Sequence, residues 1–73
     1  MIEVFKTNVC NPEHANSLLE KIHASFNGHS ASFDLDDCDK VLRVQCHTGN
    51  VESPLLISLL KEHGYHAEIL PDH

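Results

Sequence analysis

Four segments of the chain alternate hydrophobic and polar residues, the pattern that predicts half-buried β-strands. These segments are residues 2–9, 30–36, 41–47 and 66–70. The alternation is strict in the second and third segments, and a polar turn at residues 36–39 joins them. The two segments therefore predict a β-hairpin, with Leu42, Val44 and Cys46 on its buried side.

Two further segments carry hydrophobic residues at helical spacing, and each begins at a polar residue followed by proline. In the dipeptide Asn11-Pro12, asparagine can accept hydrogen bonds from first-turn amides, and proline takes a position that needs no amide hydrogen. Ser53-Pro54 repeats this arrangement, with Ser53 as the expected cap. The hydrophobic positions are Ala15, Leu18, Leu19, Ile22 and Phe26 in the first helix and Leu55, Leu56, Leu59 and Leu60 in the second.

The predicted order is strand, helix, strand, strand, helix, strand, which makes two βαβ halves joined by the hairpin. Gly28 and Gly64 end the two helices, since glycine tolerates the left-handed conformation at a helix C-terminus. Right-handed crossovers place both helices on one face of a four-stranded antiparallel sheet. We therefore predict an α+β fold, a ferredoxin-like βαββαβ two-layer sandwich, as a single domain over residues 1–73.

Composition restricts the possible functions more than it restricts the possible folds. The 73 residues and 8.2 kDa allow one small core. Eleven acidic and five basic residues give a formal net charge of −6, so the chain lacks the basic surface that nucleic acid or an anionic membrane requires. No hydrophobic run approaches the roughly 18 residues of a membrane-spanning helix. Three cysteines, which cannot all pair, and strand-like sequence directly after Met1 favour a reduced, cytoplasmic protein.

The predicted topology brings most reactive side chains to one end of the sheet. Three connections share this end: the first strand to the first helix, the hairpin turn, and the second helix to the last strand. Their reactive residues are Cys10 and His14 in the first connection, Asp36, Asp37, Cys38 and Asp39 in the second, and His63, Tyr65 and His66 in the third.

The turn at Cys10 and the run Gly64-Tyr65-His66-Ala67 before the last strand resemble the heavy-metal-associated domains of copper chaperones and metal-transporting ATPases. The resemblance in length and element order covers all 73 residues. Those domains bind soft metals through two cysteines spaced C-x-x-C at the turn before the first helix. Here Cys10 matches the first cysteine, and Glu13 stands at the position of the second. One thiolate cannot form the linear two-sulfur site of those domains.

The resemblance implies a non-catalytic binding module with a degenerate site that binds Zn or Cu weakly. Cys10 and His14 are one helical turn apart, so their side chains can face the same point. We expect His66 or Cys38 to supply a third ligand, and Tyr65 and Cys38 to form the rim. The alternative for Cys10 is a buried thiol that acts as a small hydrophobic side chain.

Two other functions lack support. A calcium loop beginning at Asp34 would need glycine and glutamate where the chain has Asp39 and Gln45, so we interpret the acidic segment as a solvated turn. Acylphosphatases resemble the predicted fold in outline, but their phosphate-binding loop needs an arginine, and residues 9–12 contain no cation. No nucleophile, base and orienting group can be assembled, so we do not expect an enzyme.

The alternative function is protein–protein interaction or homodimerisation through the sheet face that the helices leave open. We assign Phe5, Val41 and Arg43 to this face, with Gln45 and Leu70 beside them. A few hydrophobic side chains on a polar sheet suit a weak interface. A core of this size supplies only about 3 to 5 kcal/mol, so pairing would add stabilising burial. A regulatory small-molecule domain can share the same element order.

Overall fold

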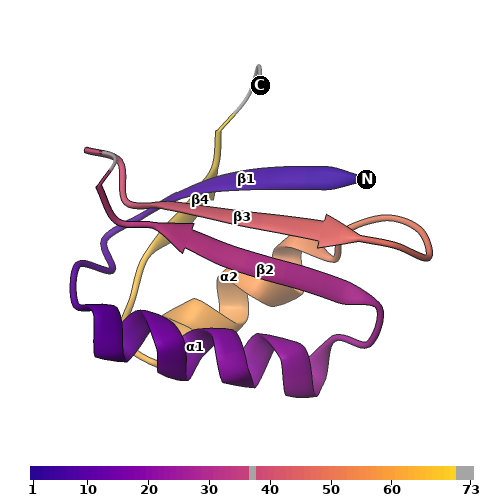
Figure 1. The fold of residues 1–73 in the computed structure, drawn as a ribbon, viewed down its shortest axis with the longest axis horizontal. Coiled ribbons are helices and arrows are strands. Elements are labelled where there is room, and N and C mark those ends of the chain that lie inside the picture. The colour runs from indigo at the N-terminus through magenta and orange to yellow at the C-terminus, as the bar shows by residue number, and fades with distance from the viewer. Residues whose placement is uncertain (37, 71–73) are drawn as a thin grey trace.

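The chain folds as two layers, a four-stranded sheet with both helices on one face (Figure 1). The computed structural model describes residues 1–36 and 38–70. Its elements are β1 (Ile2–Thr7), α1 (Pro12–Ser25), β2 (His29–Asp34), β3 (Val41–Cys46), α2 (Ser53–Glu62) and β4 (Ala67–Ile69). No helix in this part of the chain is long and apolar enough to cross a membrane. Asp37, which belongs to the predicted acidic turn, lies outside the described residues.

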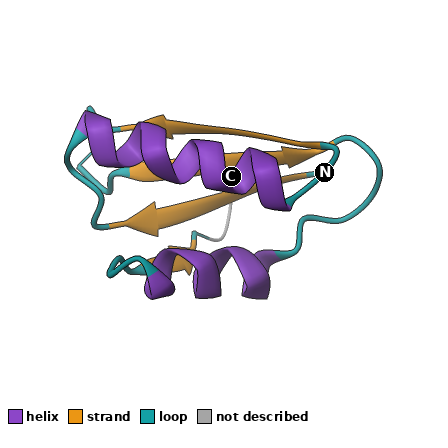
Figure 2. Ribbon diagram, turned by 90° about the horizontal axis from the view of Figure 1, so that it is seen from below, coloured by secondary structure: helices purple, strands orange, loops and turns teal. Residues whose placement is uncertain are grey.

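The strand order is β2-β3-β1-β4, and every neighbouring pair is antiparallel. Phe5 in β1 lies opposite Leu42 in β3 and Ile69 in β4, which sets the register across the centre of the sheet. Figure 2, seen from the helix side, shows α1 and α2 lying over the same face of the sheet. The predicted ferredoxin-like βαββαβ fold is therefore confirmed.

The core lies between the sheet and the two helices. Its largest fully buried side chains are Phe5, Val9, Ile22, Leu42, Val44, Leu56 and Leu60. Cys46 faces the core, as the alternation of the hairpin predicts. These side chains exclude water from the interface between the sheet and the helices. This burial of apolar surface is the main source of stability in a small domain.

The prediction that Phe5 lies on the open face is wrong, because Phe5 is fully buried in the core. Directly opposed residues in an antiparallel pair share a face, and Phe5 is opposed by the buried Leu42. Val4 and Phe5 are adjacent hydrophobic residues, so the pattern in β1 fits either face. The larger aromatic side chain takes the buried face, where it removes more apolar surface from water.

The helix boundaries follow local capping chemistry at α1 and depart from it at α2. At α1, the Asn11 side-chain oxygen accepts a hydrogen bond of 2.8 Å from the backbone N–H of Glu13, which confirms the predicted cap. At α2, Glu52 is the cap residue, and its side chain makes no capping hydrogen bond. Ser53 is instead the first helical residue, and it is buried, so the predicted serine cap is wrong.

Candidate metal-binding site at one end of the sheet

Three connections meet at one end of the sheet, which we call the loop end: residues 8–11, residues 35–36 with 38–40, and residues 63–66. The backbone N–H of Thr7 donates to the carbonyl of Asp39 at 3.1 Å, and the Thr7 hydroxyl donates to the carbonyl of Lys40. These bonds fasten the hairpin turn to the end of β1. The backbone N–H of His66 donates to the side-chain oxygen of Asn8 at 2.8 Å, which joins the third connection to the first.

Cys10 is exposed at this end, between a buried residue and the helix cap. Val9 is fully buried, and its backbone N–H donates to the Thr7 hydroxyl at 3.3 Å. Asn11 then begins α1 as its cap residue. The two anchors leave the Cys10 thiol in solvent, so Cys10 is not the buried hydrophobic side chain that was the alternative. An exposed thiol is available to a metal once it loses its proton.

His14 lies in the first turns of α1 and contacts Tyr65 from the third connection. The Tyr65 hydroxyl and His14 Nδ1 are 2.6 Å apart, and the two rings are 6.0 Å apart between centroids. When Nδ1 donates its hydrogen to the tyrosine oxygen, Nε2 keeps a lone pair that can bind a metal. When the tyrosine donates, the hydrogen lies on Nε2. This hydrogen bond therefore orients the ring and is compatible with either tautomer.

The other predicted site residues, His66 and Cys38, also lie at the loop end, but neither contacts Tyr65 as His14 does in the described residues. His66 is exposed, and its Nε2 atom is 3.8 Å from a carboxylate oxygen of Glu68. Cys38 is exposed on the hairpin turn. Within residues 1–36 and 38–70, no three His, Cys, Asp or Glu side chains form a group that could hold a metal ion. The third ligand from His66 or Cys38 stays a prediction.

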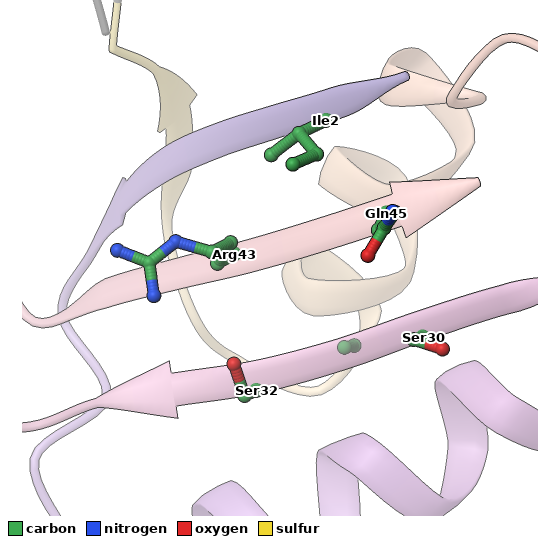
Figure 3. Close-up of a pocket in the computed structure, with 6 residues that line it drawn as sticks. Ile2, Ser30, Ser32, Arg43 and Gln45 are labelled. Carbon is green, nitrogen blue, oxygen red and sulfur yellow. The ribbon is translucent and has the colours of Figure 1, made fainter. Parts of the chain in front are cut away.

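The open face of the sheet carries a shallow groove of about 170 Å³ around Arg43 (Figure 3). Its lining residues are Ile2, Ser30, Ala31, Ser32, Arg43 and Gln45. Ile2 is 54% exposed and is the large hydrophobic side chain of this groove. The alternation in the sequence did not predict Ile2 as a residue of the open face. Val41 is only 7% exposed although it lies outside the core cluster. With Phe5 in the core, this face has less exposed apolar surface than predicted.

The fold and the loop end define a small ferredoxin-like α+β domain with an exposed thiol before its first helix. A solved structure described as "Crosstalk between Cu(I) and Zn(II) homeostasis" is similar, with a TM-score of 0.70 and 20% identity over 96% of this chain and 99% of that chain. The N-terminal domain of PacS from Synechocystis PCC6803 is also similar, with a TM-score of 0.67 and 20% identity over 96% of this chain and 97% of that chain. No family model and no curated protein matches the chain. At this level of identity the likeness establishes the fold.

Proposed function

We propose that this chain is a non-catalytic metal-binding module of the heavy-metal-associated type, in which Cys10 and His14 bind Zn(II) or Cu(I) weakly. The hydrogen bond between Tyr65 and His14, with His14 four residues after the exposed Cys10, is the observation that carries this proposal. It supplies the outer-shell contact that usually orients a metal-binding histidine. Fold likeness to a structure concerned with Cu(I) and Zn(II) homeostasis supports the same choice of metals.

The expected affinity is low because the ligand set is small. Structural zinc sites use four protein ligands, and Cys10 with His14 supplies two. Water or a ligand from another molecule would complete the coordination, as at open zinc sites. His66 is the best third candidate in this chain, because its backbone hydrogen bond to Asn8 holds it against the connection that carries Cys10. Thiolate and imidazole ligands suit both proposed metals.

Titration with Zn(II), and separately with Cu(I), under reducing conditions tests the proposal. We expect Cys10→Ala to weaken binding by about a hundredfold and His14→Ala by about tenfold, since each variant removes a direct ligand. His47→Ala is the matched control, because His47 lies at the other end of the sheet and its Nε2 atom contacts Ser30. Equal affinity in the parent and Cys10→Ala would overturn the proposal, as would a loss of the same size in His47→Ala.

A second candidate function, protein interaction or homodimerisation, rests on the groove around Arg43. Arg43 is exposed and makes no ion pair within the described residues. Arginine is enriched at interfaces, and the exposed Ile2 in the same groove adds apolar surface. Sedimentation at rising protein concentration tests this candidate. Mass that rises in the parent and stays monomeric in Arg43→Glu and Ile2→Ser supports self-association, and constant monomer mass in the parent excludes the homodimer.

A further inference from the structure

A second groove, of about 190 Å³, lies between α1 and the connection that follows α2. Its lining residues are His14, Ser17, Leu18, Lys21, His63 and Tyr65. The four from α1 stand at positions i, i+3, i+4 and i+7, so they lie along one side of the helix. Leu18 is almost fully buried, and the polar residues stand around it.

The groove carries one lysine, several hydrogen-bonding side chains and no acidic residue on an otherwise acidic chain. None of its lining residues is acidic, although the chain has eleven acidic residues and a formal net charge of −6. Lys21 carries a full positive charge, and its ammonium group makes no ion pair or hydrogen bond within residues 1–36 and 38–70. The Ser17 hydroxyl and the His63 ring are likewise unengaged in this part of the chain. These groups are therefore available to a ligand.

We propose that this groove binds a small oxyanion, a phosphate or a carboxylate, with Lys21 as the counter-charge and Ser17 and His63 as donors. Lysine is a compact charge with three donors and suits phosphate and carboxylate oxygens. Hydrogen bonds to an ionised acceptor are roughly twice as strong as neutral ones. Tyr65 is already engaged with His14, so the three other polar groups carry the recognition. The inference does not depend on metal binding at Cys10.

The test is a titration of the metal-free, reduced protein with inorganic phosphate and, separately, with citrate, followed by amide NMR shifts. Sodium chloride at matched ionic strength controls for general salt effects. We expect saturable shifts at Ser17, Lys21 and His63, with a dissociation constant on the order of 1 mM for a partly exposed site. Tighter binding of phosphate identifies a phosphate ligand, and tighter binding of citrate identifies a carboxylate.

Variants with the same change in net charge test whether the oxyanion binds in this groove. Lys21→Gln should weaken binding by about fivefold, and Ser17→Ala by about twofold, as expected for partly exposed contacts. Lys61→Gln changes the net charge equally on an exposed residue outside the groove lining, so it should leave affinity unchanged. Equal losses in the two lysine variants, or shifts that sodium chloride reproduces, would overturn the proposal. Lys21→Gln should retain the zinc affinity of the parent, which keeps this test separate from the metal proposal.

Discussion

The two ends of the sheet both carry histidines, but the contacts and exposure of the histidine rings differ between the ends. At the end opposite the loop end, ring nitrogens are engaged with the backbone or with a neighbouring hydroxyl. His23 Nε2 accepts the backbone N–H of Ala31 at 3.3 Å, and His29 Nδ1 donates to the carbonyl of Asn27 at 3.1 Å. His47 Nε2 contacts the Ser30 hydroxyl at 2.9 Å. These contacts fasten the end of α1 to the start of β2 and β2 to β3.

The loop end carries an exposed thiol and an exposed histidine. His14 Nδ1 contacts the Tyr65 hydroxyl, and Cys10 lies in the connection that leads into α1. At the opposite end, His29 Nε2 has no hydrogen-bond partner in the described residues, yet it is buried and a metal ion cannot reach it without opening the structure. The two ends therefore differ in access, because Cys10 and His14 at the loop end are exposed.

The cysteines at the two ends also differ in exposure, since Cys10 is exposed and Cys46 is buried. We expect the rates of thiol labelling to show the largest difference between the ends. Cys46 is 4% exposed, and the backbone N–H of Thr48 lowers the pKa of its thiol below the ordinary value. A lowered pKa raises the thiolate fraction at Cys46, which by itself would speed its reaction. We expect access to dominate instead, so that Cys10 reacts about a hundredfold faster, because labelling of a buried thiol waits for local opening.

Two double variants isolate these thiols for a kinetic measurement with a maleimide at neutral pH. Cys38→Ala with Cys46→Ala leaves Cys10, and Cys10→Ala with Cys38→Ala leaves Cys46. Mild urea should accelerate only the labelling of Cys46, since urea promotes opening. Equal labelling rates in native buffer would contradict the difference in access between the ends.

Removal of the Thr7 hydroxyl should give the next largest effect, on the free energy of unfolding. Thr7→Val leaves the carbonyl of Lys40 and the backbone N–H of Val9 without this hydroxyl, which should cost about 1 to 2 kcal/mol at a buried position. Thr48→Val is the same substitution on an exposed residue at the opposite end, and we expect it to cost less than about 0.5 kcal/mol. Urea unfolding measures both, and equal losses would show that the loop end is not fastened through Thr7.

The smallest expected difference between the two ends is in stability, on replacing one glycine at each end with alanine. Gly28 and Gly64 have φ angles of +76° and +88°, so alanine at either position should cost about 1 kcal/mol in backbone strain. A Cβ atom at Gly28 would also lie 3.1 Å from the Thr48 hydroxyl oxygen, whereas one at Gly64 would meet nothing within 4 Å. We expect Gly28→Ala to lose about 0.5 kcal/mol more stability than Gly64→Ala, as a crowded neighbour adds to the strain.

Thermal unfolding of the Gly28→Ala, Thr48→Ala double variant separates crowding from strain. The extra loss should disappear in this background, because the side chain of Thr48 supplies the contact. Persistence of the full loss would show that strain alone sets the cost at this end.

Local signals predicted most elements of this fold. The dipeptide Asn11-Pro12 specifies the start of α1 because the capping hydrogen bond joins residues only two apart. Ser53-Pro54 has the same chemistry in the sequence, but Ser53 packs into the buried start of α2 and Glu52 takes the cap position. A local capping rule therefore holds where the residue is exposed, and tertiary burial overrides it elsewhere.

The candidate site also has one part that the sequence predicts and one part that depends on tertiary packing. Element order alone predicts that the connection carrying Cys10 and the one carrying Tyr65 share an end, because a βαββαβ chain reverses direction in a fixed sequence. The contact between Tyr65 and His14 joins residues 51 apart. No local pattern specifies such a pair, since its distance depends on how α1 and α2 pack on the sheet.

The sequence by itself determined the order of elements, the hairpin and the end of the sheet where the reactive residues gather, because each follows from periodicity, capping and chain reversal. Only the tertiary structure decided that Phe5 is buried, that Cys10 is exposed and that Tyr65 orients His14. Burial and side-chain contact depend on which surfaces meet when the layers pack, and residues distant along the chain supply those surfaces.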